Sequence, residues 1–201
     1  MKRLLIIIFF TFNFHSLINA DDISSITIEG ISIGDSALDF FSKEDIDKNS
    51  YDFYKIKTFV PVQINKKFDF FKTFDAVDFN YRTGDKNFTI VAIDGVLLIR
   101  DPIKCEKKLD QIVIDIAPIL EGNHEIEKAT VIHDSDPSGK SKIVEKQWIM
   151  QNGDRVLVQC YNFDVNYNSG NNNLSISIRT KEFHNFLRKI AYKDSAWSFK
   201  L

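Results

Sequence analysis

The sequence predicts an α+β fold in which helices cover an antiparallel sheet, and two observations carry this prediction. First, strand-like segments follow one another through short turns instead of alternating one by one with helices, which favours meanders over parallel βαβ units. Second, a helical pattern follows each of two groups of strands. We therefore expect two meander-plus-helix halves. No long linker divides the chain, so they should form a single domain over residues 21–201.

The first half is predicted to begin with a strand over residues 23–29, followed by two short helices. Asp35 is the expected N-cap of the first helix, over residues 37–41. Ser42 opens the second through a capping-box pattern with Asp in place of Glu. The remaining expected elements are strands over residues 54–62, 74–82, 88–93 and 96–100, with Asp94-Gly95 as a hairpin turn between the last two.

A longer helix is predicted to open at Asp101-Pro102 and to end at Gly122, because its apolar residues recur at helical spacing. This apolar stripe consists of Cys105, Leu109, Ile112, Val113, Ile116 and Leu120.

The second half is predicted to repeat the order of strands and then a helix. Thr180 is the expected N-cap of this last helix, whose apolar face comprises Phe183, Phe186, Leu187, Ile190 and Ala191. The expected strands cover residues 126–133, 142–150, 155–163 and 174–180, with an Asn152-Gly153 hairpin.

The two cysteines of the chain, Cys105 and Cys160, are predicted to form a disulfide. Cys105 lies on the apolar stripe of the long helix, and Cys160 shares one face of a strand with Val156 and Val158. A helix packed on this sheet would bring the two sulfur atoms together. The bond should stabilise the fold by about 4 kcal/mol on the chain-entropy argument. A redox pair would instead favour the close C-x-x-C spacing.

The first twenty residues have the pattern of a secretory signal peptide. Met1-Lys2-Arg3 is a short basic region, residues 4–14 are almost wholly apolar, and Ala20 precedes an acidic pair. The apolar run is shorter than the roughly 18 residues of a membrane span. A retained single-span anchor is the alternative. We expect cleavage after residue 20, an exported protein in the periplasm or outside the cell, and no membrane span in the mature chain.

The charge of the mature chain argues against two classes of partner. Removing Lys2 and Arg3 leaves 24 basic against 28 acidic residues, a net charge of −4. Nucleic acids and anionic membranes both require a basic surface, so neither is an expected partner. Lys, Ile and Phe are frequent, which fits a bacterial source.

Residues 33–36, Ile-Gly-Asp-Ser, resemble the nucleophile block of GDSL-type esterases, in which the Ser attacks an ester. Such an enzyme also needs a late His after an Asp spacer, D-x-x-H, because a base must take the proton of the Ser. The late His184 has Lys181 at the position of that Asp. We therefore predict that Ser36 is a residue of a helix-cap region without nucleophilic chemistry.

The segment from Asp134 to Glu145 fits the D-x-D-x-S-G-x5-E pattern of a calcium loop. Strand patterns flank it where an EF-hand has helices, and Lys140 and Lys142 lie inside it. We predict a polar hairpin turn without metal, in which these lysines compensate the acids. The four ligand positions of the pattern are Asp134, Asp136, Ser138 and Glu145.

The opening I-x-G-I-S-I-G-D-S, over residues 28–36, resembles that of small exported bacterial proteins of unknown function. Further points of likeness are residues 39–41, 136–140 and 180–183 and Cys160. A second likeness is to β-lactamase-inhibitor and outer-membrane-assembly lipoprotein modules, in which an I-x-I-G turn opens a helix pair. The sequence lacks the lipidated Cys of those modules.

Together these features favour a non-enzymatic binding or interaction module of the bacterial envelope, without a cofactor. Its expected partner is a protein or another envelope component, and no oligomeric state is indicated. The alternative is a small serine hydrolase that uses Ser36.

Overall fold

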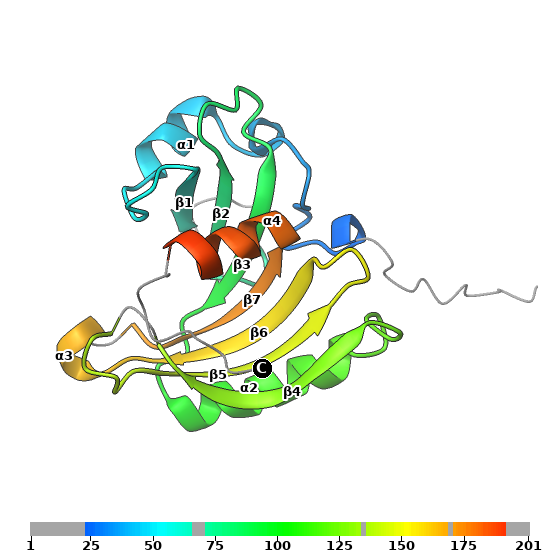
Figure 1. The fold of residues 1–201 in the computed structure, drawn as a ribbon, viewed down its shortest axis with the longest axis vertical. Coiled ribbons are helices and arrows are strands. Elements are labelled where there is room, and N and C mark those ends of the chain that lie inside the picture. The colour runs from blue at the N-terminus through cyan, green and yellow to red at the C-terminus, as the bar shows by residue number, and fades with distance from the viewer. Residues whose placement is uncertain (1–22, 66–70, 134–135, 169–170, 192–201) are drawn as a thin grey trace, which may run out of the picture.

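The computed structural model describes residues 23–65, 71–133, 136–168 and 171–191. They form one seven-stranded antiparallel sheet with helices on both faces, which confirms the predicted α+β class (Figure 1). The order across the sheet is β1-β2-β3-β7-β6-β5-β4. The strands are β1 (Phe59–Asn65), β2 (Ala76–Arg82), β3 (Ile90–Leu97), β4 (His124–Ile132), β5 (Lys142–Ile149), β6 (Arg155–Asn162) and β7 (Asn173–Arg179).

The sheet consists of two meanders joined along one pair of strands. β1 to β3 form the first meander and β4 to β7 the second. The seam between them is the antiparallel pairing of β3 with β7, in which Ala92 lies opposite Arg179 and Leu97 opposite Leu174. The two expected halves therefore share one continuous sheet.

The helix α2 (Pro102–Ile116) covers one face of the second meander. Asp101 caps it as predicted, accepting from the backbone N–H groups of Ile103 and Lys104. Its buried side chains pack against the apolar side chains of β5, β6 and β7. That cluster includes Cys105, Leu109, Ile112, Trp148, Val156, Val158, Cys160 and Leu174.

The N-terminal segment covers the same face of the first meander. It contains the 3-10 turns Ile23–Ser25 and Ala37–Asp39 and the helix α1 (Lys43–Asn49). Ser42 caps α1 as predicted, accepting from the N–H of Asp45. The shared core comprises, among others, Ile31, Phe41, Ile46, Val62, Ile64, Val77, Phe79 and Ile93.

The opposite face is covered only in part. The short helix α4 (Lys181–Phe186), capped by Thr180 as predicted, continues into a π-helical turn, Leu187–Ala191. Figure 1 shows it in front of the sheet, with α2 behind. Phe183 and Phe186 pack on Tyr54, Phe59 and Ala92. The helix α3 (Val165–Asn168) lies between β6 and β7 in the chain.

None of the helices formed by residues 23–65, 71–133, 136–168 and 171–191 is long and apolar enough to span a membrane.

The structure joins Cys105 of α2 to Cys160 of β6 in a disulfide, as predicted. Their Cα atoms are 5.9 Å apart. Both side chains are buried in the cluster beneath α2.

The predicted strand over residues 23–29 is wrong. Glu29 and Gly30 have φ angles of 52° and 82°, and Ile28 pairs with Ile31 around them in a tight turn. The Glu29 carboxylate accepts hydrogen bonds from the backbone N–H groups of Lys72, Thr73 and Phe74. A distant loop thus fixes the turn.

The predicted hairpin at Asp94-Gly95 is also wrong, because β3 runs straight through both residues. Asp94 lies opposite Asp78 of β2 and Ser177 of β7. Gly95 does not adopt a positive φ. A Cβ atom there would lie 2.7 Å from the ring of Phe74. The glycine is needed for the close approach of this ring, not for a turn.

Several element ends differ from the sequence predictions. Ser36, not Asp35, caps the turn at Ala37–Asp39, while the Asp35 carboxylate accepts from the N–H of Ser32. The first predicted strand of the meander begins at Phe59 instead of residue 54, and α2 ends at Ile116. Ile190, assigned to an apolar face, is 45% exposed.

We expect Cys105 and Cys160 to be linked in protein exported through its own leader. Mass spectrometry of unreduced peptides should find them joined, and replacing both by Ser should lower the free energy of unfolding by about 4 kcal/mol. Two free thiols in the exported protein would contradict this expectation.

Gly95→Ala should destabilise the fold by about 1 to 3 kcal/mol, because the added methyl group overlaps the Phe74 ring. In a Phe74→Leu background, which lacks the ring, Gly95→Ala should lower the free energy of unfolding much less. Denaturant unfolding of the two single variants and the double variant measures this coupling. Additive effects would show that the ring does not determine the residue at position 95.

Candidate functional site

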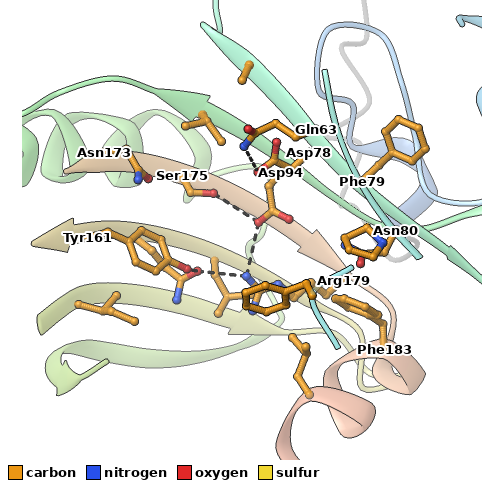
Figure 2. A pocket seen from close by; sticks show the side chains of 18 of the residues that line it. Gln63, Asp78, Phe79, Asn80, Asp94, Tyr161, Asn173, Ser175, Arg179 and Phe183 are labelled. Carbon is orange, nitrogen blue, oxygen red and sulfur yellow. Dashed lines mark hydrogen bonds and ion pairs between the residues drawn. The ribbon is translucent and has the colours of Figure 1, made fainter. Parts of the chain in front are cut away.

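A cavity of about 580 Å³ lies on the sheet face that α4 covers only in part. Side chains of β1, β2, β3, β5, β6 and β7 form its floor, and α4 and residues 51–54 contribute to its walls. Figure 2 shows polar side chains of neighbouring strands converging in this space. A cavity of this size can enclose a small organic molecule.

The strand register explains why the floor is polar. Alternate residues of a strand point to opposite faces, so each apolar residue beneath α2 or the N-terminal segment is followed by one that points into the cavity. One row across the sheet runs from Gln63 through Asp78, Asp94 and Ser177 to Leu157. Arg179 and Arg155 lie opposite each other in the adjacent row.

Arg179 is the centre of a hydrogen-bonded network on this floor. Its Nη2 atom lies 3.4 Å from Oδ1 of Asp94 and 3.3 Å from Oε1 of Gln159 (Figure 2). Ser175 donates to the same oxygen of Asp94, and the Tyr161 hydroxyl donates to Gln159. Burial alone would lower the pKa of Arg179, but Asp94 raises it, so the guanidinium stays charged.

Asp78 is the least satisfied acid of the site. Its Oδ2 atom accepts one hydrogen bond, from Gln63 at 3.2 Å. Its Oδ1 atom is buried, and no described residue donates to it. Burial and the neighbouring carboxylate of Asp94 together raise the pKa of Asp78 to about 7. Asp78 should therefore titrate near neutral pH.

Aromatic side chains line the end of the cavity that holds Asp78 and Asp94, which we call the acid end. The rings of Tyr51 and Phe53 lie 6.2 Å apart, and those of Phe53 and Tyr54 lie 5.2 Å apart, edge to face. Burial, then Asp78 and Asp94, raise the pKa of the Tyr51 hydroxyl, which places Tyr51 close to both acids. Tyr51 and Phe53 are about half exposed, at 45% and 52%.

The other end of the cavity is basic and is formed by β6, β7 and α4. We call it the guanidinium end: Arg155, Arg179, Arg188 and His184. Both ring nitrogens of the buried His184 lack a hydrogen-bond partner among the residues that the structure describes. Burial, followed by the three arginines, lowers the pKa of His184 to about 3, so the ring is neutral.

Glu145 of β5 borders the guanidinium end. It accepts a hydrogen bond of 2.7 Å from Gln159. Burial raises its pKa, which Gln159 and the arginines partly oppose. Arg155 donates to Gln147 at 2.9 Å, and its buried Nε atom has no partner within the described part of the chain. Burial and Arg188 lower the pKa of Arg155.

Ser36 lies away from this cavity, at the start of the turn Ala37–Asp39. Its hydroxyl accepts from the N–H of Leu38 and donates to the carbonyl of Asn87 at 2.7 Å. These are the contacts of a cap residue. His133 and His184 line the cavity instead.

The candidate calcium ligands are not brought together. Asp136 accepts from the N–H groups of Ser138 and Ser141 and from the Ser141 hydroxyl, which lower its pKa. Its partners are thus turn residues and not the lysines that we expected. Glu145 lies in β5 on the cavity floor, and Asp134 lies outside the described residues. No three acidic, His or Cys side chains in the described ranges form a metal-binding group.

The main residues of the cavity were not among the candidates from the sequence. Asp78 and Asp94 occupy the polar positions of alternating strands, which a sequence assigns to solvent. Asp94 also stands before a glycine, which imitates a turn. The register of β2, β3 and β7 is the information that unites these acids with Arg179.

No family model, curated protein or solved structure matches this chain. The likeness of its opening to small exported bacterial proteins therefore stays a prediction.

The raised pKa of Asp78 predicts a pH-dependent stability. Between pH 4 and 7 the folded protein keeps a proton that an unfolded aspartate releases, so the free energy of unfolding should fall as the pH rises. Asp78→Asn should remove this dependence and stabilise the protein by about 2 to 4 kcal/mol at pH 8. Urea unfolding at pH 4, 6 and 8 measures the effect.

Asp85→Asn is a control for which the expected change of stability with pH has the opposite sign. Backbone hydrogen bonds from Asn87 and Thr89 lower the pKa of Asp85. Removing the Asp85 carboxylate should lower the free energy of unfolding at neutral pH. This difference should vanish in acid, where the carboxylate is protonated in both the folded and the unfolded protein. An equal effect of Asp78→Asn at all three pH values would contradict the assignment.

Proposed function

We propose that this protein is an exported, non-enzymatic binding protein whose cavity holds a small molecule with a positively charged amino group. The observation that carries the proposal is the carboxylate of Asp78, which has a buried, unpartnered oxygen among the described residues and lies opposite Asp94. A buried carboxylate oxygen without a donor lowers stability, so it fits a role in binding a ligand.

A bound ammonium group would remove both causes of the raised pKa. It would donate the hydrogen bond that Oδ1 lacks among the described residues, and its charge would offset the repulsion between Asp78 and Asp94. A metal ion is a poorer match, since no described group of three acidic, His or Cys side chains could hold one. The acid end therefore supports an organic cation.

The aromatic wall supports the same class of ligand. Tyr51, Phe53 and Tyr54 present ring faces and edges beside the two acids. Aromatic rings attract cations and also bury the carbon atoms next to an amino group. An amine with an apolar substituent would use both properties.

Export is supported by two features. The first twenty residues have the pattern of a leader, and the disulfide between Cys105 and Cys160 suits an oxidising compartment. The periplasm or the extracellular space is thus the proposed location, and an envelope component or a molecule that passes through the envelope is the proposed source of the ligand.

The test compares phenethylamine with its neutral analogue 2-phenylethanol by calorimetry and thermal unfolding. The amine should bind and raise the melting temperature, and the alcohol should not. Binding should be about thirtyfold tighter at pH 8 than at pH 5.5, because Asp78 is protonated in acid whereas an alkylamine with a pKa of about 10 stays charged.

Asp78→Asn should abolish the preference for the amine. The matched control is Asp115→Asn on α2, where the carboxylate contacts Gln111 away from the cavity. Equal affinity for amine and alcohol, or an unchanged preference in Asp78→Asn, would contradict the proposal.

The alternative is a small serine hydrolase that uses Ser36. Labelling of Ser36 by a fluorophosphonate probe, lost in Ser36→Ala, would favour this alternative over a binding protein.

A further inference from the structure

The guanidinium end gathers three cationic side chains. Arg155, Arg179 and Arg188 lie close enough to lower the pKa of His184 together. Asp94 is bound to Arg179, and Glu145 accepts a hydrogen bond from Gln159 beside them. The positive potential of these side chains favours an anion.

Unpartnered donors at this end point to where such an anion would bind. The Nε atoms of Arg155 and Arg179 are buried and lack an acceptor in the described ranges. The same holds for both ring nitrogens of His184. Buried guanidinium N–H groups without an acceptor are costly, and a carboxylate is the planar acceptor that suits them.

We propose that the guanidinium end binds the carboxylate of the ligand whose amino group lies at Asp78, so that the ligand is a short free peptide. This inference rests on the proposed function and extends it from an amine to a zwitterion.

The distance between the two ends sets the length of the peptide. Asp78 is on β2 and Arg155 on β6, with β3 and β7 between them. Three strand spacings of about 4.8 Å and a shift of two residues along the strand separate the backbone at these positions by about 16 Å. Both side chains line the cavity and shorten this gap. An amino acid is too short to reach both ends. An extended chain advances about 3.3 to 3.6 Å per residue, so a peptide of about three to four residues fits.

The floor of the cavity suits peptide groups. Amide side chains line it, and each of them can both donate and accept a hydrogen bond, as a peptide group requires. These include Gln63, Asn80, Gln159 and Asn173. The aromatic side chains at the acid end would lie beside the first residue of the peptide.

The test uses trialanine and tetraalanine in three forms: free, N-acetylated and C-amidated. Calorimetry at pH 8 should show saturable binding of a free peptide and at least a tenfold loss for either modification. Arg155→Gln should weaken binding of the free peptide at least tenfold and leave the C-amidated form unchanged. Arg155→Lys, which keeps the charge, should restore part of the affinity.

The three forms separate this inference from the proposed function. If acetylation weakens binding but amidation does not, the amine site stands and the carboxylate site is wrong. If amidation alone matters, the amine site is wrong. If no form binds, the peptide inference is overturned, while phenethylamine still tests the amine site.

The ring of His184 gives a second measurement that needs no variant. A carboxylate at the guanidinium end would accept a hydrogen bond from one of the ring nitrogens, which lack a partner among the described residues. The ring proton shifts of His184, followed by NMR at pH 8, should therefore change when the free peptide binds and change less with the C-amidated one. An equal response to both forms would overturn the inference.

Discussion

The ion pair between Arg179 and Asp94 lies across the seam on which the rest of the structure depends. β3 and β7 are far apart in the chain, and their pairing makes one sheet of two meanders. Apolar side chains secure one side of this seam, and the ion pair, with Ser175, secures the other. Desolvation offsets much of the attraction within a buried pair. Because this pair forms only in the observed register of β3 and β7, we infer that it helps to align the two halves.

The two faces of the sheet serve different purposes. One face is covered by the N-terminal segment and α2 from β1 as far as β5, and the side chains beneath them form two apolar clusters. The other face holds acids, amides and arginines beneath a partial cover. A face built for stability alone would not bury one oxygen of Asp78 and both ring nitrogens of His184 without partners from the described residues. Such a loss of stability from unpartnered buried atoms is typical of ligand-binding sites.

Local patterns were sufficient to predict much of the fold. The cap at Asp101, the apolar stripe of α2 and the face of β6 that carries Cys160 each depend on neighbours in the sequence, and all three predictions are confirmed. Predictions failed where a distant residue decided the outcome. The ring of Phe74 requires a glycine at position 95. From its neighbours in the sequence alone, that glycine predicts a hairpin turn.

The cavity could not be predicted for a related reason. Alternation along β2 and β3 correctly indicates which residues share a face, but not whether solvent or another element lies above that face. Asp78 becomes a buried acid only because its register sets it against Asp94 and because α4 and residues 51–54 form walls around it. Neither fact is encoded near Asp78 in the sequence.

The disulfide also has a mechanical consequence for the cavity. Cys160 lies between Gln159 and Tyr161, whose side chains point to the opposite face and line the floor. Its bond to α2 therefore ties the backbone beneath these two residues to a rigid helix. Because this part of the floor is held to α2, we expect any adjustment of the cavity to the shape of a guest to come from α4 and the aromatic wall.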